Sequence, residues 1–296
     1  MTVGWGVGAS EVSESVHARP SVALRPYADW YSGYRLEGGA PGTHRGLPSP
    51  QLTLIFTLHE PLQIAEHPDP AQPGGSFAAL VGGLHTRPAL ITHPGSQSGV
   101  QIALNPLGAR ALLGMPAAEL AVRDLSAGDI LGDAFVDALR TRLLEAATWP
   151  ERMRVLETQL LTRLAETPPE DALRPELLHA WRMLLTRGGA LDVPALARSV
   201  GWSERHLRAR FQAEFGVGPK TFARLVRFTN ARRALPGRVR AGDTLAGLAA
   251  AHGYYDQAHL AAEFRAFAGC PPTTWLAEEF RNLQAPGVRT RRESAA

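Results

Sequence analysis

The C-terminal third of the chain carries a helical hydrophobic pattern that occurs twice, about fifty residues apart. In each copy the core positions recur at i, i+3, i+4 and i+7, which is the spacing of one buried helical face. The positions are Val193, Leu196, Ala197 and Val200 in the first copy, and Leu245, Leu248, Ala249 and His252 in the second. A repeat of this period indicates a duplicated structural unit.

A glycine and a capping residue divide each copy into two helices. Gly201 and Gly253 can adopt the left-handed backbone that ends a helix, and Ser203 and Asp256 are good N-caps for the next one. The inner stripe of that next helix is Leu207, Phe211 and Phe215 in the first copy, and Leu260, Phe264 and Phe267 in the second. A short helix, a glycine turn and a longer capped helix predict a helix-turn-helix, with a plain all-α bundle as the alternative.

Two segments carry a resemblance to a known family: GWSERHLRARFQAEFGVGPKTF, which begins at Gly201, and GYYDQAHLAAEFRAFAGCPPTTW, which begins at Gly253. They are similar to the paired motifs of AraC/XylS-type transcription regulators, over about 90 of the 296 residues. The resemblance implies a seven-helix, homeodomain-like DNA-binding domain in which a long central helix joins two helix-turn-helix units.

The hydrophobic pattern of the first hundred residues is that of β-strands. In QLTLIFTLH, Leu52, Leu54, Phe56 and Leu58 alternate with Thr53, Ile55, Thr57 and His59, so the two sets lie on opposite faces. Further strands are predicted at 77–84, 89–93 and 100–104, and helices at 107–113, 133–147 and 150–166. The pattern predicts an α+β domain ahead of the all-α one.

These patterns divide the chain into five parts. They are a disordered tail at 1–20, an α+β effector-sensing or dimerisation domain at 21–166, a proline-rich linker at 167–175, the double helix-turn-helix domain at 176–284, and a disordered tail at 285–296. The first segment lacks the basic and apolar regions of a signal peptide, and no run of 18 apolar residues occurs. We therefore expect a cytoplasmic, nucleoid-associated protein without a membrane partner, and the lone Cys270 fits a reducing compartment.

The formal charge is distributed unevenly. Residues 1–187 hold 15 Arg and Lys against 19 Asp and Glu, a net charge of −4, whereas residues 188–296 hold 16 against 9, a net charge of +7. A basic C-terminal half on a mildly acidic N-terminal half predicts that the C-terminal half binds double-stranded DNA.

In a helix-turn-helix the second helix presents its N-terminal residues to base edges in the major groove. In the first unit Arg205 and Arg208 match base-reading positions of the family pattern, although contact with phosphate is an equal alternative. Glu204 could accept from cytosine or simply favour the helix N-terminus. In the second unit Gln257 and His259 are the candidate readers, flanked by alanines, so weaker readout is expected there.

A second group of residues is expected to contact the DNA backbone. The central helix is predicted at 219–235, about 25 Å long, with its end at Pro236-Gly237 and its arginines facing outward. The predicted backbone contacts are Ser203, Arg210, Arg224, Arg227, Arg232 and Arg233, together with Arg238 and Arg240 in the following loop.

The N-terminal domain shows no fingerprint of an enzyme, a metal site or a cofactor. Its histidines, at 44, 59, 67, 85 and 93, lack paired ligand spacing, and no nucleophile elbow, P-loop or dinucleotide motif is present in context. Residues that could line an effector pocket are Tyr31, Tyr34, Arg35, His44 and Arg45, with ordinary loop packing as the alternative.

The resemblance implies a sequence-specific, effector-responsive regulator that is not an enzyme. It also allows RNA polymerase and a second copy of the chain as partners, and leaves the effector unnamed. One alternative is a DNA-targeted enzyme, which would need a reactive cysteine outside the DNA motif, whereas Cys270 lies inside it. The other is a helix-turn-helix used only for contact with proteins.

Overall fold

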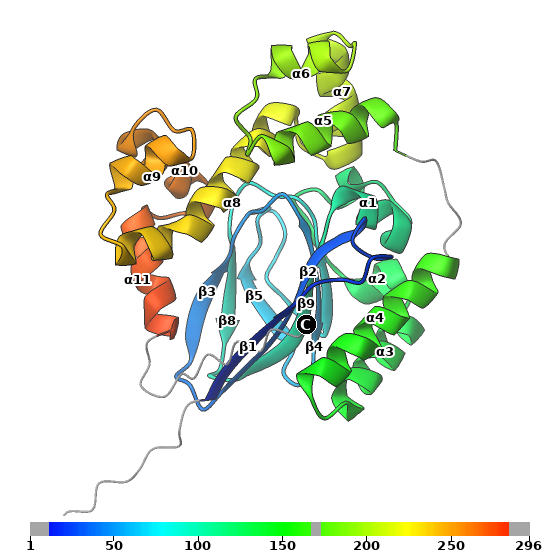
Figure 1. Ribbon diagram of the computed structural model, residues 1–296. Coiled ribbons are helices and arrows are strands. Elements are labelled where there is room, and N and C mark those ends of the chain that lie inside the picture. The colour runs from blue at the N-terminus through cyan, green and yellow to red at the C-terminus, as the bar shows by residue number, and fades with distance from the viewer. Residues whose placement is uncertain (1–11, 167–172, 284–296) are drawn as a thin grey trace, which may run out of the picture.

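A computed structural model describes residues 12–166 and 173–283, and its N-terminal part is built from two antiparallel sheets that face each other (Figure 1). The larger sheet has the strand order β1-β2-β9-β4-β7-β10 and the smaller one has the order β3-β8-β5-β6. The strands are β1 Val12–Ala18, β2 Ala28–Glu37, β3 Gly42–Gly46, β4 Leu52–Thr57, β5 Leu62–Glu66, β6 Gly75–Phe77, β7 Ala79–Gly82, β8 Ala89–His93, β9 Gln97–Leu104 and β10 Asp124–Ser126.

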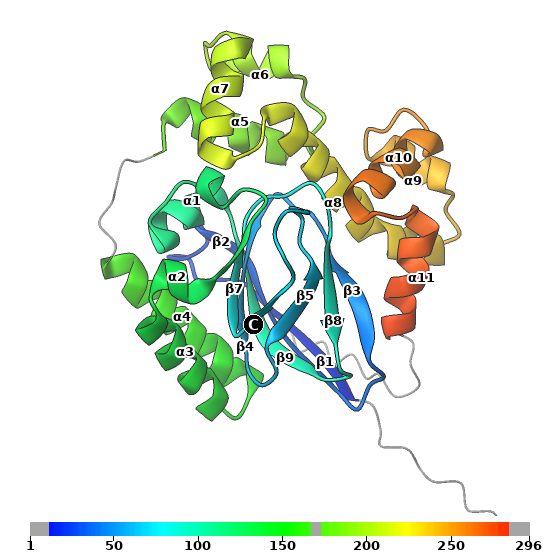
Figure 2. The same ribbon diagram turned by 180° about the vertical axis from the view of Figure 1, so that it is seen from behind.

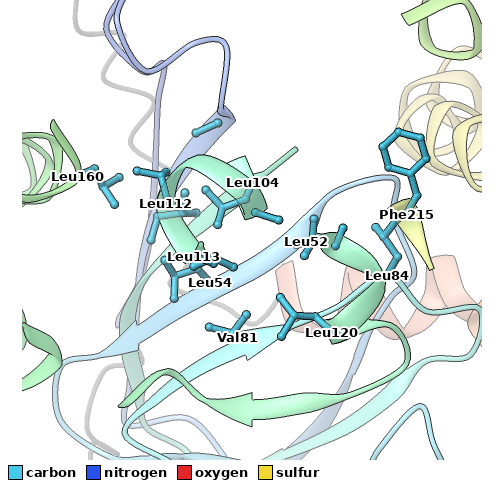
Figure 3. Close-up of a cluster of buried hydrophobic side chains, with 14 of the residues drawn as sticks. Leu52, Leu54, Val81, Leu84, Leu104, Leu112, Leu113, Leu120, Leu160 and Phe215 are labelled. Carbon is cyan, nitrogen blue, oxygen red and sulfur yellow. The ribbon is translucent and has the colours of Figure 1, made fainter. Parts of the chain in front are cut away.

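The alternation in β4 determines how the larger sheet is covered. Leu52, Leu54 and Phe56 belong to the core between this sheet and the flanking helices, while Ile55 packs with Ile64 and Ile91 between the two sheets. The two predicted faces of the strand therefore meet two different apolar clusters. Figure 3 shows part of the larger cluster, in which Leu54 lies near Leu113 and Leu52 lies near Leu84.

The helices of the N-terminal part flank the larger sheet (Figure 2). They are α1 Pro106–Gly108, the π-helical turn η1 Ala109–Leu113, the 3-10 turn η2 Ala117–Leu120, α2 Ala127–Leu131, α3 Asp133–Glu145 and α4 Trp149–Glu166. The helices predicted at 107–113, 133–147 and 150–166 are present. Gly114, with φ of +74°, ends the first of them.

The N-terminal boundary differs from the prediction. Residues 12–18 form strand β1, which pairs with β2 along its whole length from Val12 opposite Glu37 to Ala18 opposite Tyr31. The sequence of β1 is polar and carries no clear alternation, because β1 is an edge strand and gains its stability from backbone pairing. The disordered tail predicted at 1–20 is therefore wrong for residues 12–18, and residues 1–11 and 284–296 lie outside the described residues. The predicted linker also lies mostly outside them, at 167–172.

The C-terminal part is all-helical, which confirms the predicted order of an α+β part followed by two helix-turn-helix units. Its helices are α5 Pro175–Thr186, α6 Val193–Ser199, α7 Glu204–Phe215, α8 Pro219–Arg240, α9 Leu245–Ala251, α10 Gln257–Ala268 and α11 Pro272–Leu283. Gly201 and Gly253 have φ of +70° and +71°. The side chains of Ser203 and Asp256 accept from the backbone N–H of His206 (3.2 Å) and His259 (2.7 Å), as N-caps do.

Helix α8 is longer than predicted, because Pro236-Gly237 does not end it. The helix continues to Arg240, and the backbone N–H of Ala241 donates to the carbonyl of Gly237 at 3.1 Å. Proline removes one hydrogen bond from a helix interior without preventing the turns beyond it. With 22 residues at 1.5 Å each, α8 is about 33 Å long, so the two units lie at opposite ends of a longer rod (Figure 1).

Candidate DNA-binding surface and effector cavity

The first reading helix, α7, buries one stripe and exposes the predicted readers. Leu207 and Phe211 are fully buried, while Arg205 and Arg208 are exposed. Arg208 Nη2 donates to Glu204 Oε2 at 2.9 Å, an i, i+4 pair whose side chains are 61% and 44% exposed. Arg205 forms no ion pair with any side chain that the structure describes, so its guanidinium is free to bind an external acceptor.

Two predicted backbone contacts belong to this helix, one at its N-cap and one within it. The hydroxyl of Ser203 is exposed and already caps α7, although a hydroxyl that accepts one bond can still donate its own proton to phosphate. Arg210 lies within α7 and is exposed. Both positions are therefore accessible.

The second reading helix, α10, exposes Gln257, but His259 is partly committed to the protein. The ring Nδ1 of His259 accepts from the backbone N–H of Tyr255 at 3.3 Å, and the ring packs edge-on against Tyr254, with centroids 5.2 Å apart. Tyr255, which the sequence reasoning missed, is 93% exposed immediately before the N-cap. A large aromatic residue directly before the N-cap of a reading helix is the sequence feature that could have identified Tyr255 as a candidate DNA contact.

The arginines of α8 are not arranged as predicted, since three of the four expected to face outward contact the protein. Arg224 pairs with the buried Glu263 at 2.7 Å, and Arg227 Nη1 donates to the carbonyl of Gly189 at 3.0 Å. Arg232 lies with its guanidinium 5.9 Å from the centre of the Trp275 ring. Because α8 is the central helix, α10 and α11 cover positions of α8 that its own hydrophobic pattern predicts to be exposed to solvent. Of these four, Arg233 alone is exposed.

The two last predicted backbone contacts, Arg238 and Arg240, lie on the final turn of α8 and not in a loop. Both are exposed, and Arg238 Nη1 donates to Asp243 Oδ2 at 2.8 Å. Cations at a helix C-terminus also interact favourably with the helix dipole, which gives these residues a structural role beside any contact with phosphate.

A cavity of about 370 Å³ lies between the two sheets and contains only part of the predicted effector pocket. Tyr34, His44 and Arg45 line it, whereas Tyr31 and Arg35 line a different pocket outside the sheet. The predicted pocket of five residues is therefore wrong as a single site. Successive side chains of β2 point to opposite faces, so residues 31 and 35 cannot share the face of residue 34.

The strand alternation identifies cavity residues that the sequence reasoning missed. On β2, β4 and β9 the inward positions include Trp30, Ser32, Thr53, Gln101 and Ala103, all of which line the cavity. Applying a period of two to each strand would have found them.

Two side chains that line the cavity carry buried polar atoms, and other lining side chains titrate away from their usual range. Trp30 Nε1 and Gln51 Oε1 have no hydrogen-bond partner among the residues that the structure describes. Burial lowers the pKa of His44 to about 4, with a further contribution from His93, and burial raises the pKa of Tyr34 to about 12. His44 and Tyr34 are therefore neutral at pH 7, and together with the charged Arg45, Asp124 and Arg232 they give the cavity a polar lining that suits a polar ligand.

The cavity is bounded by the C-terminal part as well. Arg232 of α8 lines it, and Arg45 Nε donates to Glu278 Oε2 of α11 at 3.0 Å. A cavity bounded by both parts of the chain gives a bound molecule a direct way to influence the second helix-turn-helix unit.

The first unit is docked on the N-terminal part through a second interface. Arg110 of η1 forms a two-point ion pair with Glu214 of α7, with Nε–Oε1 and Nη2–Oε2 distances of 2.6 and 2.7 Å. Phe215 packs into the same cluster as Leu84 (Figure 3). A Cβ at Gly216 would overlap Ala121, so only glycine allows this approach.

Within the described ranges, 12–166 and 173–283, no group of three or more His, Cys, Asp or Glu side chains is placed to hold a metal ion. His67 and Asp124 form a buried pair, with Nδ1 and Oδ2 2.8 Å apart. In the same part of the chain no helix is both long and apolar enough to cross a membrane.

Residues 196–278 match the profile of a helix-turn-helix domain, and residues 16–126 match that of a domain of unknown function (DUF6597). The C-terminal part is therefore an AraC/XylS-type double helix-turn-helix domain, and the chain is a DNA-binding transcription regulator. A search of curated proteins by sequence found no match.

Solved structures with a related fold include ToxT from Vibrio cholerae. A variant of apo ToxT is 8% identical, with a TM-score of 0.50 over 88% of this chain and 99% of ToxT. Another ToxT structure is 9% identical, with a TM-score of 0.49 over 83% of this chain and 97% of ToxT. The AraC-like transcriptional activator CuxR is 14% identical, with a TM-score of 0.27 over 77% of this chain and 88% of CuxR.

Proposed function

We propose that this regulator recognises its operator mainly through Arg205 and Arg208 of α7. The observation that carries the proposal is the free, exposed guanidinium of Arg205 in the first turn of a reading helix. An arginine there can donate two N–H groups to guanine O6 and N7, worth about 1–3 kcal/mol of discrimination. Glu204 holds Arg208 in place in the free protein and is available to accept from a cytosine amino group.

The second unit contributes less base readout in this proposal and serves mainly as an anchor. Gln257 is its free candidate for contact with adenine, while His259 is held by Tyr254 and Tyr255. The exposed Arg210, Arg233, Arg238 and Arg240 supply phosphate contacts, and Tyr255 adds a hydroxyl donor at the groove edge. Arg224, Arg227 and Arg232 are excluded from this set by their contacts within the protein.

Fluorescence anisotropy with duplex from the region upstream of the protein's own gene tests the proposal, with a scrambled duplex beside it and several salt concentrations. The Arg205→Ala/Arg208→Ala double variant is expected to lose the preference for the native duplex while keeping salt-dependent binding. Binding of neither duplex at any salt concentration would favour a helix-turn-helix used only for contact with proteins.

We further propose that a small polar molecule in the cavity between the sheets is the effector. The buried, unpartnered Trp30 N–H and Gln51 carbonyl support this, since a ligand would satisfy one donor and one acceptor. The ligand acts on DNA binding through Arg232 and the Arg45–Glu278 pair, by binding and without a catalytic step. Nucleoid association, contact with RNA polymerase and pairing with a second copy of the chain are consistent with such a regulator and belong to the same proposal.

A thermal-shift screen of polar metabolites identifies the effector, and a filled cavity provides the control. Ala103→Leu places three additional carbon atoms in the cavity, because Ala103 faces into it from β9. A compound that raises the melting temperature of the native protein should not raise that of Ala103→Leu. A compound that stabilises both proteins equally binds elsewhere.

A further inference from the structure

A second pocket, of about 560 Å³, lies on the opposite face of the larger sheet from the cavity between the sheets. It is bounded by β1, by Arg19 directly after β1, by β2, and by residues 147–148 with the first half of α4. Its volume is in the range that binds small organic ligands. Neither the proposed DNA contacts nor the proposed effector cavity uses any of its residues.

One wall of this outer pocket is the Trp149 indole, which is held on three sides. Its Nε1–H donates to Glu14 Oε2 at 3.1 Å, and its ring lies against Gly33, where a Cβ would overlap it. The guanidinium of Arg152 stacks over the ring, 4.8 Å from its centre. An indole that is fixed in this way forms a rigid wall against which a ligand can lie.

The floor of the outer pocket is apolar apart from one buried hydroxyl. Val16 and Ala18 of β1 and Met153 of α4 supply the apolar surface. Tyr31 is fully buried at the floor, and its hydroxyl has no hydrogen-bond partner among the described residues. Burial and the nearby Glu157 raise the pKa of this phenol, so it stays protonated and can donate to an acceptor on a ligand.

The charged groups at the rim favour an anion. Four arginines line the outer pocket against two glutamates, Glu14 and Glu157, and both carboxylates already accept a hydrogen bond, from Trp149 and from the backbone N–H of Ser21. The four arginines are Arg19, Arg35, Arg152 and Arg154.

Arg152 is the least neutralised of the partly buried cations. Its Nε donates to the carbonyl of Leu143 at 3.1 Å, whereas Arg35 is paired at two points with Glu37. No ion pair joins Arg152 to any carboxylate that the structure describes. Burial and Arg35 lower the pKa of its guanidinium, and the charges of Glu14 and Glu151 oppose this only in part. An anionic group from a ligand would compensate this cation.

We propose that this outer pocket binds a flat aromatic molecule that carries one carboxylate. The ring of the ligand lies beside Trp149 and over Val16 and Ala18, the carboxylate pairs with Arg152, and an acceptor on the ligand meets the hydroxyl of Tyr31. This site is separate from the cavity between the sheets and does not rest on the proposed function. The chain therefore has two small-molecule sites on the two faces of one sheet.

Two probes of matched shape test the proposal in the full-length protein: indole-3-acetate and its neutral analogue indole-3-acetamide. Their Kd values are measured by saturation-transfer difference NMR. We expect the carboxylate to bind roughly tenfold more tightly than the amide, as one added charge-assisted hydrogen bond predicts. Equal affinity of the two probes for the native protein would overturn the proposal.

Variants locate the binding and identify the cation. Arg152→Gln should bring the two affinities together, and Arg152→Lys should retain a preference for the carboxylate. Arg142→Gln, which removes an exposed charge of α3 outside the pocket, should leave the affinities for both probes unchanged. Ala18→Phe fills the pocket and should weaken both probes by about tenfold or more.

The filling variants distinguish the two sites. Loss of both probes in Ala103→Leu with retention in Ala18→Phe would place the binding in the cavity between the sheets and refute the outer site. Melting temperatures and DNA binding are measured for every variant. If Arg152→Gln fails to fold, the matched probes and Ala18→Phe still decide the outcome. Failure of this proposal leaves the DNA-binding measurements unaffected.

Discussion

At the residue scale, the environment of each arginine decides what it can contribute to DNA binding. Arg205 and Arg233 are exposed on α7 and α8, whereas Arg224 is fixed against Glu263, which is only 7% exposed. The sequence places all three on basic helices. Only the tertiary partners show that Arg224 stabilises the second unit and that the other two are free.

Arg205→Ala and Arg233→Ala should therefore have different effects on DNA binding. The first should weaken binding to the operator by about 1–3 kcal/mol while leaving a scrambled duplex little changed, because a base contact is lost. The second should weaken both duplexes and reduce the salt slope of log K by about 0.9, because one phosphate contact is lost. Anisotropy titrations over a salt series measure both effects. If Arg205→Ala loses equal affinity for both duplexes, Arg205 contacts phosphate and not a base.

His44 provides a prediction on pH. Burial lowers its folded pKa to about 4 from the usual 6.5, so the unfolded chain binds the proton more readily between these values. The contribution of His44 to the free energy of unfolding is therefore fully present above pH 6.5. It is lost as the pH falls toward 4, by roughly 3 kcal/mol at most. Urea unfolding across this range should show a smaller pH dependence in His44→Gln than in the native protein. The same change at the exposed His179 is the control, and an unchanged slope in His44→Gln would refute the assignment.

At the scale of elements, local pattern predicted most of the architecture and failed where tertiary contacts override it. The alternation of Leu52–Leu58 and the spacing around Leu196 and Leu248 were sufficient to place strands and helix-turn-helix units. Strand β1 was missed because its pairing partner, β2, supplies the order that its own sequence lacks. Two of the five candidate pocket residues, Tyr31 and Arg35, were misplaced because they were grouped with Tyr34 without regard to strand alternation.

Gly237 in helix α8 allows a prediction about the stability of the protein. Gly237 lies inside the helix, and a methyl group on its Cα would have no neighbouring atom within 4 Å beyond the helix's own backbone. Gly237→Ala should therefore stabilise the protein by about 0.5–1 kcal/mol. Gly189→Ala is the contrasting variant, since φ is +76° there and a Cβ would overlap the carbonyl of Ala223. Chemical denaturation of both should give shifts of opposite sign. Destabilisation by Gly237→Ala would mean that the last turn of α8 is not helical in solution.

At the scale of the whole molecule, each helix-turn-helix unit has its own ion pair to the N-terminal part. Arg110–Glu214 holds the first unit and Arg45–Glu278 holds the second, on either side of the rod α8. The relative orientation of the reading helices therefore depends on the N-terminal part as well as on α8. This arrangement connects the proposed effector cavity, which Arg45 lines, to the geometry of DNA binding.

The Arg110–Glu214 pair should make a measurable contribution to stability because its side chains are only 25% and 10% exposed. A double-mutant cycle with Arg110→Gln and Glu214→Gln should give a coupling energy of about 1–2 kcal/mol, less than a fully buried pair because solvent screens Arg110. The same cycle on Arg238 and Asp243, which are 46% and 40% exposed, should give less than about 0.5 kcal/mol. Equal coupling in the two cycles would show that the first unit is not held against the N-terminal part in solution, and that α7 is oriented by α8 alone.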